Sequence, residues 1–387
     1  MVDNYKAVRY DAVVVGGGPA GASSARFLSE KGLKVLLLEK RKLPRFKLCA
    51  GCLSVRITPL LPTGWESEVL NTIRGGYLGF RGEKFHHKTS GEPVAYIIDR
   101  ASFDHFLVKS AVESGADLWE ETEFLSFEGD RTLRVRTDKG AVETDLLIGA
   151  DGFYTKVGKQ LGYQKRKFFR SVEFWTEGDL GEEVVIDIGI VKRGYGWIFP
   201  KGDKVSVGLA TTGRENTLDV LKDYVKRHEL LKSKEVKGVK GWMIPYLTSP
   251  SEAQLGKGRV MLVGDSANLV DPLLGEGIYY GVLGGKLLAE SITQNPGSPL
   301  QTYTDLVRRE IIPELVYAGK IARLAYNFQR PAFIMGGGFT MDRFLKLLRG
   351  ETDYKELYIK GMPDFVRSLL SFENFSHIII DKILRRR

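Results

Sequence analysis

The sequence has only two cysteines, Cys49 and Cys52, among its 387 residues, so it cannot carry a disulfide framework. One C-x-x-C pair also leaves a structural zinc site incomplete, because such a site needs four ligands. The five histidines lack metal-binding spacing, and no G-x-S-x-G nucleophile turn occurs. We therefore expect no bound metal and no hydrolase of that class.

Long apolar runs are also missing. The most apolar stretch, residues 260–283, is broken by Asp265, Asp271 and Glu276, so we expect no membrane-spanning helix. The N-terminus carries charged residues early and lacks the pattern of a signal peptide. These features favour a cytoplasmic protein, and peripheral contact with the inner face of the cell membrane stays open.

The charge balance is basic, with 57 Lys and Arg against 48 Asp and Glu. Such an excess favours anionic partners. Because the basic residues are mostly interspersed with acidic ones, we expect a solvated surface and no nucleic-acid binding. Apolar residues make up 43% of the chain, as in an ordered globular protein, and its 44 glycines are clustered. Clustered glycines indicate places where the backbone approaches a ligand closely.

The first such cluster lies in a strand–helix–strand unit. Residues 11–15 (DAVVV) form a β-branched run typical of a buried parallel strand, and residues 34–38 (KVLLL) form a second. Between them, Gly16-Gly17-Gly18-Pro19-Ala20-Gly21 satisfies G-x-G-x-x-G and opens a helix, whose N-terminus would face phosphate charge. Glu39 follows the second strand, where a carboxylate accepts hydrogen bonds from ribose hydroxyls. Together these features predict an adenine-dinucleotide site.

The strand pattern predicts how the chain is organised. Residues 132–137 and 141–144 read as a hairpin, and 145–150 and 259–263 as two further buried strands. The stretch between them is rich in alternating strand formers. We expect an α/β fold in which a Rossmann-type domain is interrupted by an antiparallel β-sheet substrate layer, with a helical C-terminal region. The expected divisions are 1–170 with an insertion near 55–97, 171–255, 256–298 and 299–387.

Asp151-Gly152 and Gly264-Asp265 each follow one of these later strands. With the first glycine loop, they resemble FAD proteins related to p-hydroxybenzoate hydroxylase. The resemblance implies that Asp265 binds the ribityl chain of FAD and that Arg100, in an R-x-x-[FL]-D-like segment, contacts its phosphates. The family's middle motif usually reads D-G-x-x-S-x-x-R, but Thr155 and Gly158 stand in place of its serine and arginine. That departure places direct reduction by NADPH in doubt.

Three segments resemble the geranylgeranyl reductase family more specifically. Residues 47–53 (KLCAGCL) are similar to its K-x-C-G-G-G-L loop, and residues 195–200 (YGWIFP) match Y-x-W-x-F-P. Residues 271–278 (DPLLGEGI) match its P-x-x-G-E-G-I turn, and a helix beginning there would stabilise a reduced flavin. The resemblance covers about residues 8–295. The cofactor-binding residues it implies are Gly16, Gly18, Pro19, Ala20, Gly21, Glu39, Cys49, Ala50, Gly51, Arg100, Asp265, Gly275, Gly277 and Ile278.

The implied reaction saturates C=C bonds in geranylgeranyl chains of polyprenyl lipids, of the archaeal ether-lipid type, by a hydride from flavin N5 and a proton. The donor of electrons would be NAD(P)H or ferredoxin. Tyr195, Trp197 and Phe199 alternate on a strand and would face the substrate, although ordinary core packing also explains them. Cys49 and Tyr195 are candidate proton donors. Cys49 could equally be a packing residue, or form a reversible disulfide with Cys52.

Two other functions stay open. One is an FAD-dependent monooxygenase or halogenase acting on an aromatic, although the halogenase W-x-W-x-I-P motif is absent. The other is a flavin-bearing electron-transfer module, which predicts no deep apolar cavity beside the flavin. The tail 364–387 is apolar and ends in three arginines, so it fits a membrane-interface helix and a core-covering helix equally well.

Overall fold

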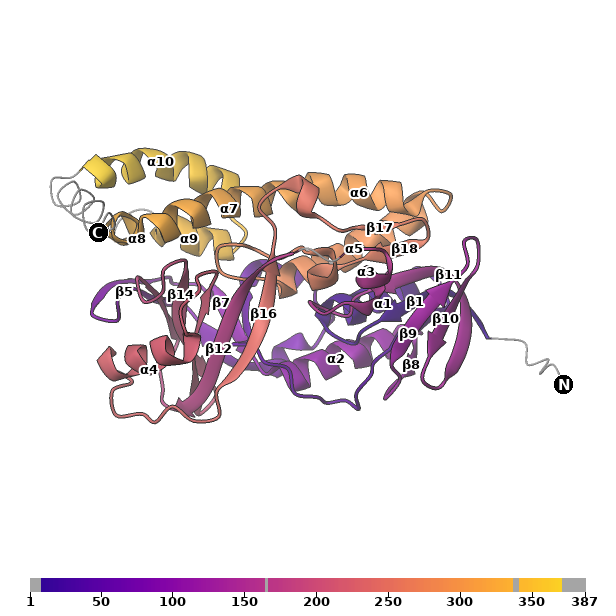
Figure 1. The fold of residues 1–387 in the computed structure, drawn as a ribbon, viewed down its shortest axis with the longest axis horizontal. Helices are drawn as coiled ribbons and strands as arrows, with labels where there is room; N and C mark the ends of the chain where they lie inside the picture. The colour runs from indigo at the N-terminus through magenta and orange to yellow at the C-terminus, as the bar shows by residue number, and fades with distance from the viewer. Residues whose placement is uncertain (1–7, 164–165, 337–340, 371–387) are drawn as a thin grey trace.

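The computed structural model describes residues 8–163, 166–336 and 341–370. One end of the elongated molecule holds a mostly parallel sheet with its helices, and the other end holds a larger, mostly antiparallel sheet. The C-terminal helices run along one side of both (Figure 1). This arrangement confirms the predicted fold class.

The first sheet has the strand order β17-β18-β11-β1-β2-β8, and β10 and β9 continue from β11. β1 lies between β11 and β2 and pairs with both in parallel. The strands are β1 (Arg9–Val15), β2 (Val35–Leu38), β8 (Asp117–Trp119), β9 (Phe124–Glu128), β10 (Leu133–Thr137), β11 (Gly140–Gly149), β17 (Gly256–Lys257) and β18 (Val260–Leu262).

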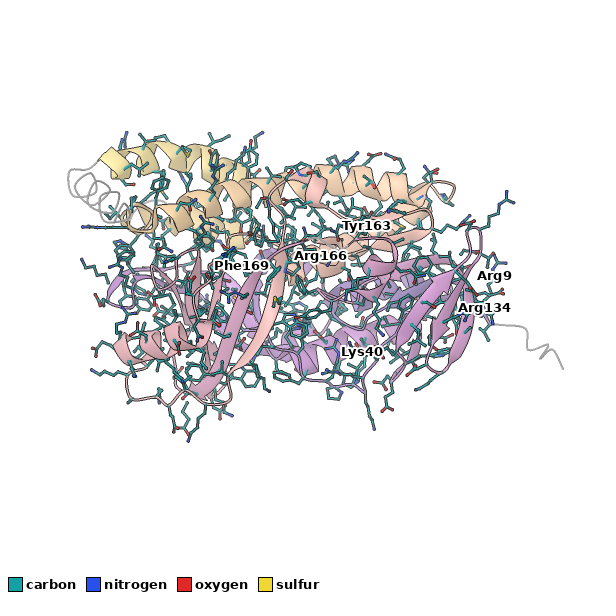
Figure 2. All side chains as sticks on the ribbon, in the orientation of Figure 1. Arg9, Lys40, Arg134, Tyr163, Arg166 and Phe169 are labelled. Atoms are coloured by element: carbon teal, nitrogen blue, oxygen red, sulfur yellow. The ribbon has the colours of Figure 1, made fainter. Side chains whose placement is uncertain are left out.

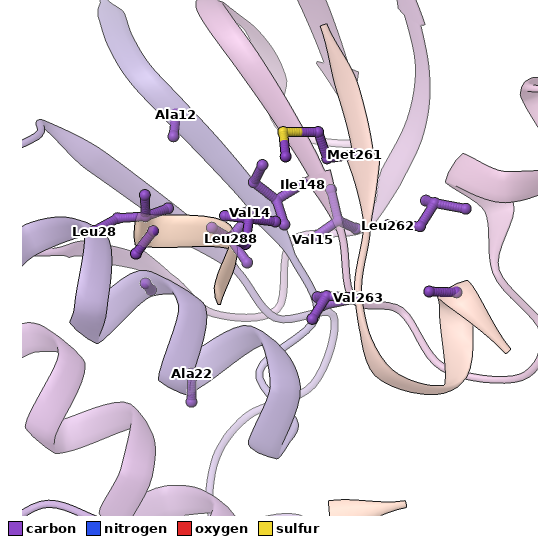
Figure 3. Packing of buried hydrophobic residues seen from close by; sticks show 14 of the residues in the cluster. Ala12, Val14, Val15, Ala22, Leu28, Ile148, Met261, Leu262, Val263 and Leu288 are labelled. Atoms are coloured by element: carbon purple, nitrogen blue, oxygen red, sulfur yellow. The ribbon is translucent and has the colours of Figure 1, made fainter. Parts of the chain in front are cut away.

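Helices cover this sheet because its central strands are apolar on both faces. Figure 3 shows the core that α1 (Pro19–Glu30) and α5 (Ile278–Gln294) form with β1, β11 and β18. The predicted hairpin is confirmed as β10 and the start of β11, which pair antiparallel. Its second strand and the strand predicted after it are one continuous strand, β11, whose first half pairs with β10 and whose second half pairs with β1 and β18. The prediction of a break near residue 145 was therefore wrong.

The second sheet has the order β16-β12-β15-β14-β13-β5-β6. Its β5–β6 hairpin comes from the early part of the chain and joins through a parallel pairing of β5 with β13. The strands are β5 (Gly75–Phe80), β6 (Lys84–Thr89), β12 (Lys167–Glu177), β13 (Glu183–Ile188), β14 (Gly194–Lys201), β15 (Lys204–Thr211) and β16 (Lys240–Tyr246). A small sheet, β3 (Cys52–Ser54), β7 (Ala95–Ile98) and β4 (Val69–Ile73), completes the strands.

The remaining elements are helices. Near the sheets lie α2 (Arg100–Glu113), α3 (Lys156–Gln160), α4 (Thr217–Arg227) and the 3₁₀ turns η1 (Val55–Leu60), η2 (Trp65–Glu68), η3 (Pro250–Glu252) and η4 (Gly264–Ala267). The C-terminal helices are α6 (Pro299–Glu310), α7 (Ile312–Asn327), α8 (Gln329–Met335), α9 (Met341–Leu348) and α10 (Tyr354–Leu370).

None of the helices in the described ranges is long and apolar enough to cross a membrane. The tail 364–387, for which a membrane-interface helix and a core-covering helix were both open, falls largely outside the described residues, which end within it at residue 370. The predicted division into domains stays a prediction. The sheet shows only that residues 75–89 contribute strands to the same layer as residues 167–246.

Candidate functional site

The glycine loop after β1 has the backbone geometry of a phosphate cradle. Gly16 has a φ of +110°, and a Cβ there would lie 2.5 Å from the carbonyl oxygen of Ala150. A Cβ at Gly21 would lie 1.8 Å from the carbonyl oxygen of Gly16. Gly18 precedes α1 and has no side chain to cap its amides, so the helix N-terminus stays open to a ligand anion. The cradle therefore fits the diphosphate of a dinucleotide.

Glu39 is fixed at the end of β2 by three donors. Its Oε2 accepts hydrogen bonds from the Gly17 amide and from Arg45 Nε, both at 3.0 Å, and its Oε1 accepts one from the Arg41 amide. Arg45 Nη2 also lies 3.8 Å from the position that a Cβ at Gly18 would occupy. Arg45 thus places a positive charge at the cradle, which the sequence reading missed. The basic run 40–47 after Glu39 was its only signal.

Arg100, predicted to contact phosphates, is held inside the protein by Asp104. Its Nε and Nη2 donate to the two carboxylate oxygens at 2.7 and 2.9 Å, and Arg45 Nη1 donates to the same carboxylate at 3.0 Å. Arg100 also interacts with the sulfur of Cys49. One carboxylate therefore connects two arginines, and it fixes both beside the glycine loop and the 47–53 segment.

The turn that carries Asp265 packs against the glycine loop, since a Cβ at Gly264 would lie 2.8 Å from the Cβ of Ala20. Asp265 Oδ1 is 3.0 Å from the position that a Cβ at Gly277, just before α5, would occupy. The carboxylate has no hydrogen bond or ion pair to the parts of the chain that the structure describes. Burial raises the pKa of Asp265, whereas Lys47, Arg100 and Arg166 lower it. A carboxylate that is half-buried and still free to accept hydrogen bonds fits the hydroxyls of a ribityl chain.

Lys47 lies in buried surroundings that lower the pKa of its amine. Burial, followed by repulsion from Arg100, lowers the pKa of Lys47 to about 7, although Asp265 and Cys49 oppose the shift. Its Nζ lies 3.4 Å from the ring centroid of Trp242 on β16. The loop 47–53 is thereby fixed against the second sheet, so the cofactor cradle and the substrate layer share a wall.

The turn before α5 is built by several hydrogen bonds. Asp271 accepts from the Leu273 and Leu274 amides at 2.7 and 3.2 Å and from the Tyr354 hydroxyl at 2.8 Å. Burial raises the pKa of Asp271 to about 6. Gly275 has a φ of +71°, which favours glycine at that position. These contacts fix the residues from Gly275 to Ile278 at the helix start that the sequence assigned to the flavin.

A buried cation supports this turn from behind. Arg56 forms an ion pair with Glu276, and its Nη1 lies 3.8 Å from Glu314. Its guanidinium is 4.3 Å from the ring centroid of Tyr279 on α5 and also interacts with the Tyr280 ring at 5.3 Å. No pattern in the sequence indicated Arg56, because its carboxylate and aromatic partners come from segments more than 200 residues away.

The two cysteines face different surroundings. Both are free thiols, and the Sγ of Cys49 accepts a hydrogen bond from the Gly51 amide at 3.4 Å on the side of Arg100. Cys52 instead lines an apolar cavity. Burial raises the pKa of Cys52 to about 12, and nearby Glu276 adds to the shift. The neutral thiol of Cys52 is a poor nucleophile, which counts against a reversible disulfide with Cys49.

The cavity measures about 250 Å³ and lies between the second sheet and helices α7 to α10. Tyr195 and Phe199 of β14 form part of its wall. Trp197 packs beside Tyr195 with 5.9 Å between ring centroids, and its Nε1 donates to Ser206 at 3.0 Å. The three aromatics belong to one buried cluster, but only the outer two reach the cavity.

The cavity ends at the turn before α5. The hydroxyl of Tyr195 donates to the carbonyl of Leu274, and that of Tyr326 donates to the carbonyl of Leu273. Tyr195 Oη is also 3.6 Å from the position that a Cβ at Gly275 would occupy. Burial raises the pKa of Tyr195, which keeps its hydroxyl protonated at physiological pH. The apolar cavity and the candidate cofactor cradle are therefore both bordered by this one turn.

Comparison with known proteins identifies the family of this chain. Residues 9–186 match the FAD binding domain family. A digeranylgeranylglycerophospholipid reductase of Picrophilus torridus is 30% identical, with 73% of this chain and 77% of the relative covered. The solved structure of a geranylgeranyl bacteriochlorophyll reductase-like protein from Thermoplasma acidophilum superposes with a TM-score of 0.75 at 23% identity, covering 94% of this chain and 98% of that one.

The flavin-dependent brominase Bmp2 has a similar fold, with a TM-score of 0.72 at 18% identity, over 93% of this chain and 100% of the brominase. The FAD-binding family and the site together define an FAD-dependent oxidoreductase. Within that class, the chain belongs to the geranylgeranyl reductase family. FAD is its cofactor, and the predictions of the family, the cofactor and the enzyme class are confirmed.

Proposed function

We propose that the protein saturates C=C bonds in the geranylgeranyl chains of a polyprenyl lipid, of the archaeal ether-lipid type. The observation that carries this proposal is the cavity between the second sheet and α7 to α10, which reaches the turn before α5. No charged side chain lines it among the described residues. An isoprenoid chain offers only apolar surface, so such a wall suits it better than any polar substrate.

The proposal also assigns roles to individual residues. Bound FAD supplies a hydride at N5 in its reduced state. The protein's part is to bury the alkene, exclude water and supply a proton to the second carbon. Tyr195 is the better placed of the two candidate donors, because its hydroxyl lies at the cavity end, whereas Cys49 faces Arg100. The proposed cofactor contacts are Gly16, Gly18, Pro19, Ala20, Gly21, Glu39, Cys49, Ala50, Gly51, Arg100, Asp265, Gly275, Gly277 and Ile278.

The other hypotheses fit the cavity less well. An electron-transfer module needs no apolar cavity, and a halogenase or monooxygenase substrate with polar groups would leave them unpaired against this lining. NAD(P)H and ferredoxin both stay open as electron donors. Contact with a membrane surface is part of the proposal, because a lipid with long chains must enter the cavity from one.

Anaerobic incubation of the dithionite-reduced holoprotein with digeranylgeranyl lipid tests the proposal. We expect a gain of two hydrogens per reduced bond in the mass spectrum of the product. Ala325→Phe fills the cavity from α7, so it should lower product formation by roughly tenfold or more without slowing flavin reduction. Leu230→Phe, at a site that is 55% exposed, is the matched control and should retain full turnover. Absence of any mass gain with polyprenyl substrates would refute the proposal.

A further inference from the structure

One arginine ties together two turns of the cofactor site that are far apart in the sequence. Arg166 Nη1 donates to the carbonyl oxygens of Asp265 at 2.8 Å and Phe153 at 3.4 Å, and its Nη2 donates to that of Ser266 at 2.6 Å. Its Nε donates to Gln254 at 3.0 Å. Figure 2 shows Arg166 near the middle of the molecule, where the two sheets meet.

The position of this guanidinium explains both departures from the D-G-x-x-S-x-x-R motif. A Cβ at residue 158 would lie 3.3 Å from Arg166 Nη2, so Gly158 leaves room for the guanidinium. The same Cβ would lie 2.7 Å from the Cγ2 methyl of Thr155, closer than real contacts allow. Serine lacks that methyl. Threonine at 155, glycine at 158 and arginine at 166 are therefore mutually compatible, whereas threonine at 155 obstructs an arginine at 158.

We propose that Arg166 takes the place of the motif's arginine as a positioning residue for the FAD site. It joins the Asp151–Phe153 turn to the Asp265–Ser266 turn, and it thereby holds the Asp265 carboxylate at the cradle. Ser266 adds a second tie, since its Oγ accepts from the Gly152 amide at 2.9 Å and donates to Asp151 at 3.1 Å. Three carbonyl acceptors in different directions match the planar fork of a guanidinium and not the point charge of an ammonium.

The affinity of the apoprotein for FAD, measured by quenching of flavin fluorescence, tests this role. Arg166→Ala removes charged hydrogen bonds to both turns and should weaken FAD binding by roughly tenfold to a hundredfold. Arg166→Lys should weaken it less. Arg170→Ala is the matched control, because Arg170 also donates to two carbonyls, those of Gly213 and Glu215, but away from the cradle. Its FAD affinity should equal that of the wild type.

The decisive comparison moves the arginine from position 166 to position 158, where the family motif has it. The triple variant Thr155→Ser, Gly158→Arg, Arg166→Ala restores the family motif and should recover FAD affinity to within roughly threefold of the wild type. Gly158→Arg alone should lower the Tm of the apoprotein, because Thr155 and Arg166 remain in the way. The proposal is overturned if Arg166→Ala and Arg170→Ala bind FAD equally well, or if the triple variant binds as weakly as Arg166→Ala. No prenyl substrate is used, so either failure leaves the proposed lipid reduction standing.

Discussion

The buried cation behind the turn at residues 271–277 gives a quantitative prediction. The Arg56 side chain is 8% exposed, and its guanidinium faces the carboxylates of Glu276, 14% exposed, and Glu314, 20% exposed. Replacing Arg56 by methionine keeps much of the apolar stem but removes the charge. Two partly buried carboxylates are then left close together without a cation, which is the costly way to break a buried ion pair.

The structure sets the size and the pH dependence of the effect. Leaving these two carboxylates without their cation lowers the free energy of unfolding by about 3–5 kcal/mol. For a chain of this length, that loss corresponds to a Tm lower by roughly 4–6 °C. Burial already raises the pKa of Glu314, and Arg56 holds it down, so the substitution raises that pKa further. A raised pKa means that the folded state gains stability on protonation. The loss caused by Arg56→Met should therefore be larger at pH 8 than at pH 5.

Thermal unfolding of the apoprotein and the FAD-loaded protein at both pH values measures this effect. Arg74→Met is the matched control, because Arg74 and Glu182 form an exposed ion pair, at 37% and 59%, which should change the Tm by about 1 °C or less. Adding Glu276→Gln to Arg56→Met should restore part of the lost stability. Equal Tm values for Arg56→Met and Arg74→Met, or a loss that does not depend on pH, would refute the reasoning.

Two further predictions concern the buried thiol and a buried carboxyl. In a Cys49→Ser variant, iodoacetamide at pH 8 should alkylate Cys52 about a thousandfold more slowly in the folded protein than in urea. The reason is that a pKa of about 12 leaves little of the Cys52 thiol as thiolate. Comparable rates in the two states would show that Cys52 is not buried in the cavity wall. Asp187 accepts a hydrogen bond from the Tyr224 hydroxyl at 2.6 Å, and burial raises the pKa of its carboxyl to about 6. The stability that the protonated carboxyl contributes is therefore fully present below about pH 4 and is lost as the pH rises through 6. His228 Nε2 lies 3.6 Å from Asp187 Oδ2, so the comparison is made in a His228→Gln background, where titration of the imidazole does not contribute. There, the Tm advantage of Asp187 over Asp187→Asn should be greater at pH 4.5 than at pH 7.5, and a constant difference would contradict the assignment.

Local patterns predicted the strand, the glycine loop and the acidic residue that make up part of the candidate cofactor site. The strand, the glycine loop and Glu39 lie within 30 residues of each other, and their geometry follows from steric rules that a sequence displays directly. Asp265 was predicted only through its family motif, because no local rule links it to a loop about 245 residues earlier. Chain topology brings the two together, since β18 pairs in parallel with β11 beside β1.

The cavity could not be predicted in the same way. Its lining comes from strands of two sheets and from four C-terminal helices, and those helices carried no recognised motif. The different surroundings of Cys49 and Cys52 were equally hidden. Gly51 has a φ of +81°, and a Cβ there would lie 2.1 Å from the carbonyl of Ile98, so the chain turns between the two thiols. A C-x-x-C spacing alone suggests a pair, whereas this turn directs the thiols to different sites.

The turn before α5 borders both the apolar cavity and the candidate cofactor cradle. Tyr195 and Tyr326 reach it from the sheet and from α7, and each donates its hydroxyl to a carbonyl of the two residues that precede Gly275. A proton leaving Tyr195 toward an alkene carbon must first leave the Leu274 carbonyl. That carbonyl belongs to the backbone that sets the position of Gly275, so under the proposed function a proton transfer from Tyr195 would be linked to the geometry of the start of α5. Tyr195 therefore serves as a structural tie at rest, and any role as proton donor requires that tie to break.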